Sequence, residues 1–201
     1  YFGMIGSHGR KSANRALNKA DTVIIFGARL GDRSVYNAKR LGDKTKLIHI
    51  DIDPAEIGKN MQPYIPVVAD VKEAIKHLLP HLKEYKVNEE WLNEVRELKL
   101  SDRVYTEVPE DSGYVDPKYF MAALSKKTGK DVYVSTEVGQ NQIWTSNYFN
   151  FENARSLITS AGFGTMGYGL PAAIGASVAT EKPVIAVMGD GSFQMDLPEL
   201  A

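Results

Sequence analysis

The sequence contains no cysteine, so neither disulfide bridges nor thiolate metal sites can stabilise it. It also lacks long apolar runs: residues 23–26 form a stretch of strand length, far short of the roughly 20 residues that a membrane-spanning helix needs. The net charge is only −1, which gives no electrostatic reason to expect binding to nucleic acid or to an anionic membrane. We therefore expect a cytoplasmic protein with no nucleic-acid or membrane partner.

The composition that is present suits a folded globular chain. Of the 201 residues, 43% are hydrophobic and 24% are charged, which is enough apolar material for one large or two small domains. The chain begins with Tyr1 rather than methionine, and its last residues read as the start of a helix. We expect it to be a piece of a longer protein.

The first part of the chain alternates between strand and helix patterns. Runs rich in β-branched residues predict strands at residues 22–26, 46–51 and 66–70, with helices expected at residues 12–19, 35–41 and 54–60. Asp70 is a suitable N-cap for a further helix that runs to about Leu82. Such alternation favours a parallel sheet covered by helices on both faces, so residues 1–85 are predicted to form one α/β unit.

The character changes between residues 86 and 115. Trp91, Leu92, Val95 and Leu98 fall at helical spacing with charged residues between them, and residues 108–113 have the composition of a loop. We interpret this stretch as a linker that contains one amphipathic helix.

Residues 116–201 predict a second α/β unit. Asp116 and Pro117 are a helix-start signal, and a helix is expected to run to Lys127. Strands are expected at residues 132–136 and 183–188, with a glycine-rich stretch at 161–169 and a helix at 170–179 between them. The predicted fold class is therefore α/β, with two three-layer parallel-sheet units.

The second unit ends in a candidate metal site. Gly189, Asp190 and Gly191 directly follow an apolar strand, and ligands in open α/β sheets bind beyond the carboxyl ends of the strands. A carboxylate at that point suits Mg²⁺, which proteins usually hold with one or two carboxylates and the phosphates of a ligand. Taken alone, the same three residues fit a simple tight turn better than a metal site, because short motifs often match by chance.

Five segments carry a family resemblance. "EVGQNQIW", "ITSAGFGTMGYGLPAAIGA" and "GDGSFQM" in the second unit, with "HIDIDPAEIGKN" and "PVVADVKEAI" in the first, resemble the acetolactate synthase (acetohydroxyacid synthase) catalytic subunit, a thiamine diphosphate-dependent enzyme. The resemblance runs from about Gly3 to Ala201 and is weakest at residues 86–115. It implies a central FAD-binding-like domain at residues 1–85 and a thiamine diphosphate-binding domain at residues 116–201 that is cut short at its C-terminal end.

The resemblance also implies site residues in the second unit. Asp190 would bind Mg²⁺, and Asn141 stands where the family usually has histidine. Met166 would support the bent cofactor, although a methionine in this position also suits plain core filling. The residues expected to bind thiamine diphosphate are Gly139, Gln140, Asn141, Gly164, Met166, Gly191 and Ser192.

In the first unit, Asp51 ends the second strand as the ribose-binding acid does in dinucleotide folds, although residues 27–31 do not match the glycine fingerprint of those folds. By resemblance, FAD without net redox work would lie at this edge, and Ser7 replaces a methionine common in the family. The residues expected to bind FAD are Gly6, His8, Gly9, Gly27, Arg29, Asp51, Ile52, Glu56 and Asp70.

The implied activity is the decarboxylating condensation of pyruvate with a second 2-keto acid in branched-chain amino acid biosynthesis. The parent chain would form a homo-oligomer, a dimer or tetramer, and could bind a regulatory small subunit. The activating glutamate belongs to another domain of the family, so we expect no catalytic residue here and no activity from these residues alone. Another thiamine diphosphate-dependent carboligase, a 2-keto acid decarboxylase, or a non-catalytic nucleotide-binding module are the alternatives.

Other residues that could suggest a site have simpler interpretations. His49, inside a strand, is expected to be a hydrogen-bonded core histidine. His77 and His81 lie one helical turn apart, but without an evident third ligand they are expected on a solvated helix face. Trp144 and Tyr148 are expected to pack at a subunit interface.

Overall fold

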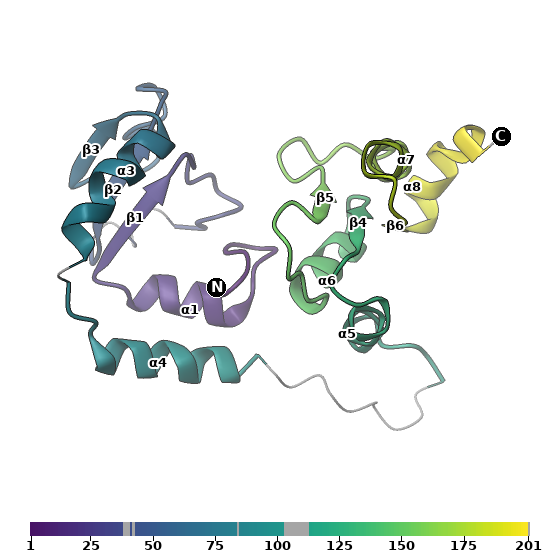
Figure 1. Ribbon diagram of the computed structural model, residues 1–201, viewed down its shortest axis with the longest axis horizontal. Helices are drawn as coiled ribbons and strands as arrows, with labels where there is room; N and C mark the ends of the chain where they lie inside the picture. Colours follow the sequence, from purple (N-terminus) through teal and green to yellow (C-terminus); the bar gives the residue numbers. More distant parts are fainter. Residues whose placement is uncertain (38–40, 42, 84, 103–112, 201) are drawn as a thin grey trace. The chain divides into compact units, whose positions relative to one another are not determined.

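The computed structural model describes residues 1–37, 41, 43–83, 85–102 and 113–200. By its contacts the chain divides into two compact units, Tyr1–Asp102 and Arg103–Ala201, and each is described by itself (Figure 1). Residues 38–40 of the helix expected at residues 35–41, and most of the loop expected at residues 108–113, lie outside the described residues.

The first unit contains a parallel sheet with the strand order β1-β2-β3: β1 is Thr22–Phe26, β2 is Lys46–Asp51 and β3 is Ile65–Val68. The register pairs Phe26 with Ile50 and Asp51 with Val68. The expectation that the carboxyl ends of these strands line one edge, with Asp51 on that edge, is confirmed. The fold class, α/β with parallel sheets, is confirmed as well.

One face of this sheet forms the core of the first unit. Ile25 of β1 and Leu47 of β2 are buried together with Leu30, Leu41 and Met61, and Leu17 of helix α1 (Lys11–Lys19) packs against them. Ile24 and Phe26 point to the other face and are exposed, as the two-residue period of a strand requires.

The expected helix at residues 54–60 is wrong, because this stretch forms consecutive turns. The backbone N–H of Glu56 donates to Asp53 O and that of Lys59 to Glu56 O, so the bonds span three residues rather than the four of an α-helix. Gly58 has a φ of +78°, which ends any helical continuation.

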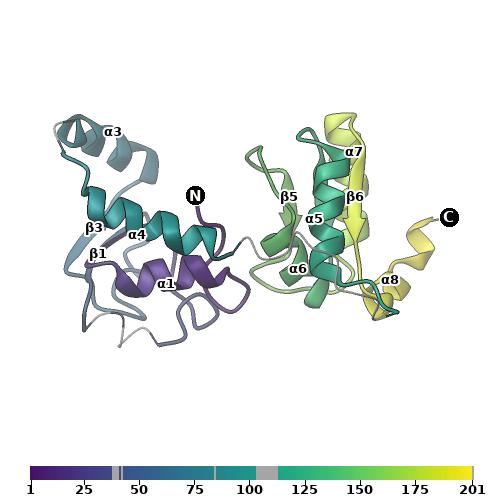
Figure 2. The same cartoon turned by 90° about the horizontal axis from the view of Figure 1, so that it is seen from below.

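Two helices complete the first unit. Helix α3 (Val71–Leu82) begins as expected at Asp70, whose side chain accepts a hydrogen bond from the Glu73 N–H. Helix α4 (Glu89–Leu100) lies beside α1 in both ribbon views (Figures 1 and 2). An ion pair between Lys19 and Glu94 joins these two helices. The helix expected at residues 86–115 therefore belongs with the first unit by its contacts.

The second unit contains a parallel sheet with a different strand order, β5-β4-β6. The strands are β4 (Tyr133–Thr136), β5 (Leu157–Thr159) and β6 (Val184–Val187), joined by helices α6 (Gln140–Tyr148) and α7 (Gly169–Thr180). The two crossovers run in opposite directions along the sheet, so right-handed connections place α6 and α7 on opposite faces. Helix α5 (Pro117–Thr128) packs on α6, which gives this unit three layers.

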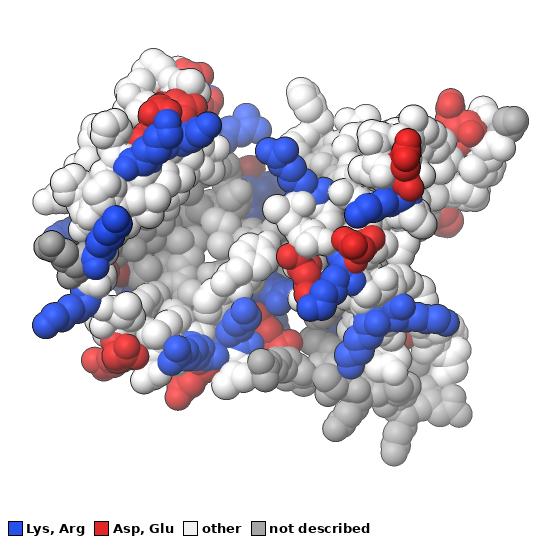
Figure 3. Space-filling model, viewed as in Figure 1, with Lys and Arg blue, Asp and Glu red and all other residues white. Residues whose placement is uncertain are grey.

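The C-terminal part of the second unit is short. Helix α8 (Asp190–Met195) follows β6 through Met188 and Gly189, and a 3₁₀ turn, η1, covers Leu197–Leu200. In the described part of the chain, no helix combines the length and apolar character needed to cross a bilayer. Lys and Arg side chains are interspersed with Asp and Glu on the face shown in Figure 3, which agrees with the near-zero net charge.

Candidate cofactor sites

The strand order of the second unit creates a natural ligand site. From β4 the chain crosses to β5 on one side and then returns past β4 to β6 on the other, so the switch point lies between β4 and β6. Thr136 pairs with Val187 at the carboxyl ends of these two strands. Open α/β sheets bind ligands in the crevice outside such a switch point. The stretches expected from sequence to bind a cofactor, 139–141 and 189–192, follow these two strands directly.

Two glycines let the loops after β4 and β6 approach each other. Gly139 precedes α6 with a φ of +131°, a conformation essentially restricted to glycine. A Cβ atom on Gly139 would lie 3.5 Å from Asn141 Nδ2, and one on Gly189 would lie 3.6 Å from the same atom. The Asn141 amide therefore lies against both loops, and its Oδ1 is buried without a hydrogen-bond partner among the described residues.

Asp190 lies at the first position of α8 and is exposed. A Cβ on Gly191 would meet nothing within 4 Å, so there is open space beside the start of this helix. Ser192 is buried, and its Oγ lies 3.4 Å from Gly189 O. Within the described residues, no three His, Cys, Asp or Glu side chains cluster as a complete metal site. Any metal at Asp190 would need its further ligands from other oxygen atoms, such as side-chain amides, backbone carbonyls, water or a bound cofactor.

The glycine-rich segment between β5 and α7 forms a fixed loop. The Gly164 N–H donates to Ser160 O and the Thr165 N–H donates to Ser160 Oγ, both at 3.1 Å, while Gly164 has a φ of +66°. Met166 is 45% exposed and does not fill the core, so its side chain is available to a ligand.

Glu137 connects the end of β4 to this segment and was missed by sequence reasoning. Its side chain is fully buried, and its carboxylate accepts hydrogen bonds from the backbone N–H groups of Gly167 (3.1 Å) and Gly169. A Cβ on Gly169 would come within 2.9 Å of Glu137 Cγ, so only glycine permits this contact. The sequence did offer one signal for Glu137: it is a charged residue that directly follows a strand and shortly precedes Gly139.

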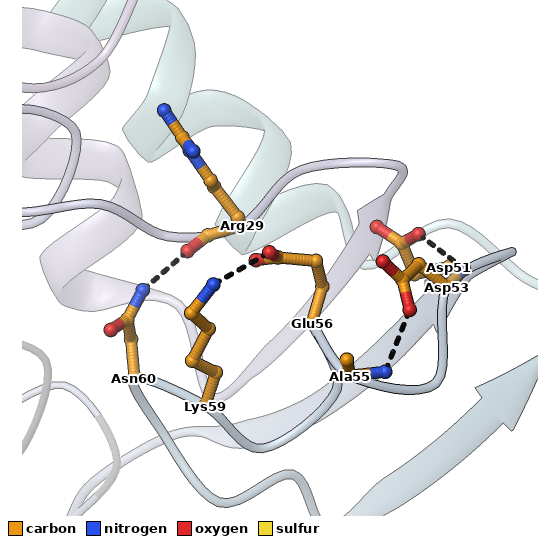
Figure 4. Close-up of polar contacts among 7 residues, drawn as sticks. All are labelled: Arg29, Asp51, Asp53, Ala55, Glu56, Lys59 and Asn60. Atoms are coloured by element: carbon orange, nitrogen blue, oxygen red, sulfur yellow. Dashed lines mark hydrogen bonds and ion pairs between the residues drawn. The ribbon is translucent and has the colours of Figure 1, made fainter.

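In the first unit, several expected FAD residues lie at one edge of the sheet (Figure 4). Asp51, buried at the end of β2, accepts a hydrogen bond from the Asp53 N–H at 2.9 Å. The Arg29 carbonyl accepts one from Asn60 Nδ2 at 2.7 Å, and Glu56 pairs with Lys59 at 2.7 Å. The second carboxylate oxygen of Glu56, Oε2, is buried without a partner among the described residues. In Figure 4 the Arg29 side chain extends away from these carboxylates.

The N-terminal loop holds two more of the expected FAD residues, Gly6 and Gly9. Asn14 Oδ1 accepts from the Gly6 N–H at 2.7 Å, and the Ser7 N–H donates to Arg33 O at 2.8 Å. A Cβ on Gly6 or Gly9 would collide with neighbouring backbone, so both positions require glycine. A cavity of about 380 Å³ opens beside Gly6 and Ser7.

Four other expected residues of this site have separate positions in the first unit. His8 lies next to Ser7, whose Oγ is 3.0 Å from His8 Nδ1. Gly27 has a φ of +58° and follows β1, and Ile52 is exposed after β2. Asp70 is occupied as the cap of α3.

The interpretation of His49 needs a correction. It is buried in β2 at 2% exposure, as a core residue should be, but neither ring nitrogen has a hydrogen-bond partner among the described residues. Its cross-strand partners on the same face are Ile25 and Pro66, whose side chains offer no hydrogen-bonding group. His77 and His81 both lie on α3 and belong to no metal-binding cluster among the described residues.

Family models match both units. Residues 1–78 match the central domain of thiamine pyrophosphate enzymes, and residues 137–201 match their C-terminal thiamine pyrophosphate-binding domain. The chain belongs to the thiamine pyrophosphate enzyme family. The matched C-terminal domain begins at Glu137 and includes both loops at the switch point of the second sheet.

Relatives from three groups of organisms are similar over almost the whole chain. The probable acetolactate synthase large subunit of Methanocaldococcus jannaschii is 41% identical over 211 residues, which cover 100% of this chain and 35% of the relative. The acetolactate synthase large subunit of Lactococcus lactis subsp. lactis is 41% identical, with the same shares covered. Acetolactate synthase 1, chloroplastic, of Oryza sativa subsp. japonica is 39% identical over 98% of this chain and 31% of the relative. The chain thus spans about a third of the length of these family members.

Proposed function

We propose that this chain forms part of an acetolactate synthase that condenses pyruvate with a second 2-keto acid. Residues 1–85 would be the central FAD-binding-like domain, residues 86–115 a linker and residues 116–201 the thiamine diphosphate-binding domain. The observation that carries the proposal is the switch point between β4 and β6, where Asn141, Gly189 and Asp190 meet. The names of the relatives agree with it.

The residues at the switch point fit a magnesium–diphosphate group. The Asn141 amide can donate from Nδ2 to a phosphate, and its unpartnered Oδ1 is a ligand type that Mg²⁺ accepts. The exposed Asp190 carboxylate would help to hold the metal, whose positive charge would offset the negative charge of the diphosphate. Backbone N–H groups after Gly139 and at Gly191 and Ser192 would provide an anion site of the kind found at glycine-rich turns.

The chain's own residues would bind and orient the cofactor. Gly164 and Met166 would hold its aminopyrimidine ring by backbone hydrogen bonds, with the exposed Met166 side chain supporting the bent shape. Gly139 and Gln140 would contact the diphosphate from the start of α6. When bound, thiamine diphosphate supplies the carbanion that attacks a 2-keto acid, so this chain's part is positioning and charge neutralisation.

We further propose that FAD binds at the carboxyl edge of the first sheet. Asp51 and the unpartnered Glu56 Oε2 are acceptors suited to ribose hydroxyl groups. The cavity beside Gly6 and Ser7 offers space for part of the cofactor next to the N-terminal loop. The FAD role of His8, Gly27, Arg29, Ile52 and Asp70 stays a prediction.

The partners are part of the same proposal. They would be 2-keto acid substrates, further copies of the same subunit in a dimer or tetramer, and a regulatory small subunit, in the cytoplasm. Another thiamine diphosphate-dependent carboligase or decarboxylase would share this magnesium–diphosphate site, so substrate assays rather than binding assays separate the two.

The test uses the native protein with thiamine diphosphate, Mg²⁺, FAD and pyruvate. We expect acetolactate formation that depends on both thiamine diphosphate and Mg²⁺. Release of acetaldehyde without acetolactate would favour a decarboxylase. Absence of any thiamine diphosphate binding, measured by calorimetry, would reject the proposal altogether.

A further inference from the structure

Two buried carboxyl groups meet over the glycine-rich segment of the second unit. Glu137 comes from the end of β4, and Asp196 follows the last residue of α8 at 6% exposure. A Cβ on Gly167 would lie 3.2 Å from Asp196 Oδ1, while the Gly167 N–H donates to Glu137 Oε2. Both carboxyl groups therefore contact the same glycine from different elements of the fold.

In the described part of the chain, no ion pair supplies this carboxyl pair with a compensating positive charge. Among the described residues, neither Glu137 nor Asp196 forms an ion pair with Lys, Arg or His. The other charged group that faces Asp196 is Glu199 of η1, and α8 itself adds Asp190 at its opposite end. Two adjacent carboxylates without a cation repel each other, and burial increases the cost of ionising both.

The two carboxyl groups are not equivalent. Glu137 accepts two backbone N–H hydrogen bonds from Gly167 and Gly169, which stabilise its charged form. Asp196 Oδ2 has no donor among the described residues. Burial, followed by the charges of Glu137 and Glu199, raises the pKa of Asp196 above its ordinary value, and a hydrogen bond to Glu137 acts in the same direction. A proton shared by the pair therefore belongs on Asp196.

We propose that Asp196 is protonated in the folded protein and donates its proton to the Glu137 carboxylate, so that the pair clamps the 167–169 segment to α8. The clamp joins two parts of the candidate cofactor site. Gly164 and Met166 lie just before the clamped segment, and Asp190 begins the helix that ends beside Asp196. Glu137 and Asp196 are thus positioning residues, and their effect on thiamine diphosphate rests on the proposed function.

Asp196→Asn tests the clamp without needing any cofactor. The amide keeps the shape and a donor toward Glu137 but cannot ionise, whereas Asp196→Ala removes both. A raised folded pKa means that the contribution of Asp196 to stability is complete below the ordinary aspartic acid pKa and is lost as pH rises through the raised value. We expect the midpoint of denaturation of the wild-type native protein to fall over that range. Asp196→Asn should remove this fall, and Asp196→Ala should lower the midpoint at every pH.

Hydrogen exchange and infrared spectroscopy give independent measurements. Wild-type peptides that cover residues 160–169 should lose protection as Asp196 ionises, and Asp196→Asn should keep it. Glu137→Gln should raise exchange in this segment by about tenfold or more, because it loses hydrogen bonds to a buried charged acceptor. The wild type should also show the infrared band of a protonated carboxyl group that is absent from Asp196→Asn.

The proposal is overturned if that infrared band is missing at all pH values above the ordinary aspartic acid range, or if Asp196→Asn destabilises the protein as much as Asp196→Ala. Thiamine diphosphate affinity is measured separately on the same variants. If no variant binds the cofactor while the infrared and exchange results hold, the proposed function fails and the clamp stands. If binding is normal but the infrared band is absent, the clamp fails and the proposed function stands.

Discussion

The two units use similar sheets but hold their candidate sites in different ways. In the first unit, the carboxylates near the sheet edge contact residues two or three apart, Asp51 with Asp53 and Glu56 with Lys59, although the Arg29 carbonyl accepts from Asn60 across 31 residues. In the second, Glu137 contacts Gly167 and Gly169 across 30 and 32 residues, and Ser135 Oγ donates to Gly169 O across 34. The carboxylates of the first site are therefore held by local turns, whereas the buried carboxylate of the second is held by tertiary contacts between distant segments.

The two sheets also differ in the order of their strands. The described strands of the first unit follow one another across the sheet as β1-β2-β3, whereas β4 in the second unit has later strands on both sides. Only the second order creates a switch point between described strands. Changes at residues of the second unit should consequently disturb ligand binding or distant contacts, and changes in the first should stay local.

The largest expected effect is on Asp190→Ala. In the native protein we expect Mg²⁺-dependent thiamine diphosphate binding to weaken more than about 100-fold, because even changes outside the ligand set cost 10–100-fold. Calorimetric titration at several Mg²⁺ concentrations measures this. The matched control is Asp131→Ala, which removes the same charge from an exposed residue. Asp131 precedes the amino end of β4, whereas the candidate site lies beyond its carboxyl end. Equal affinity in both variants would remove Asp190 from the metal site.

The sequence predicted the elements whose local signals are strong. Asp70 and Asp116 cap α3 and α5 as expected, and the strand near residues 46–51 has the expected bounds. It did not predict β5, which has three residues, or α6, whose sequence QNQIWTSNY has little apolar periodicity. Tertiary packing, rather than local preference, determines these two elements: β5 pairs with β4, and α6 packs against α5, β4 and β6.

Among the residues of the candidate sites, the sequence likewise predicted some and missed others. Most glycines and acids of both sites were expected from the family resemblance, and Asp51 and Asp190 also because each stands at or just after the end of a recognisable strand. The role of Glu137 was not, since its partners lie on a segment that only the folded chain brings near. Likewise nothing in the sequence around residue 196 indicates a second buried carboxyl group beside Glu137.

Gly169→Ala should reveal the tertiary character of the second unit. The added methyl group would lie 2.9 Å from Glu137 Cγ and 3.1 Å from the Glu137 backbone N, so we expect a loss of about 1–3 kcal/mol in unfolding free energy. Gly175→Ala on the same helix is the matched control. It meets nothing within 4 Å and should stabilise the protein by about 0.5–1 kcal/mol, because alanine favours a helix interior.

These two substitutions are compared by urea denaturation. Similar, small changes for both would show that Glu137 moves aside without cost, and the tertiary contact would then not distinguish the second unit from the first.

Asp70→Ala and Asp116→Ala test the helix N-caps, a local interaction that both units contain. Each side chain caps one helix, accepting from the Glu73 N–H at 3.1 Å and the Lys118 N–H at 2.8 Å. We expect each substitution to cost about 1 kcal/mol of unfolding free energy, the usual value of such a cap. Asp→Asn at the same positions should retain most of the stability. A much larger loss for Asp70→Ala would show that it supports more than the start of α3.

The smallest expected effects come from the exposed ion pairs, Lys19–Glu94 in the first unit and Lys130–Glu152 in the second. Both join segments far apart in sequence, yet solvent screens them, so Lys19→Ala and Lys130→Ala should leave the melting temperature unchanged within error at neutral pH.

The hydrogen bond to Glu152, and then its charge, raise the pKa of Lys130. Because the folded pKa lies above the unfolded value of about 10.4, any contribution is complete below that pH and is lost as pH rises through the folded pKa. Melting curves at neutral and strongly alkaline pH, with and without salt, measure this. A neutral-pH loss for Lys130→Ala that salt abolishes, with none for Lys19→Ala, would show that surface charge also separates the two units.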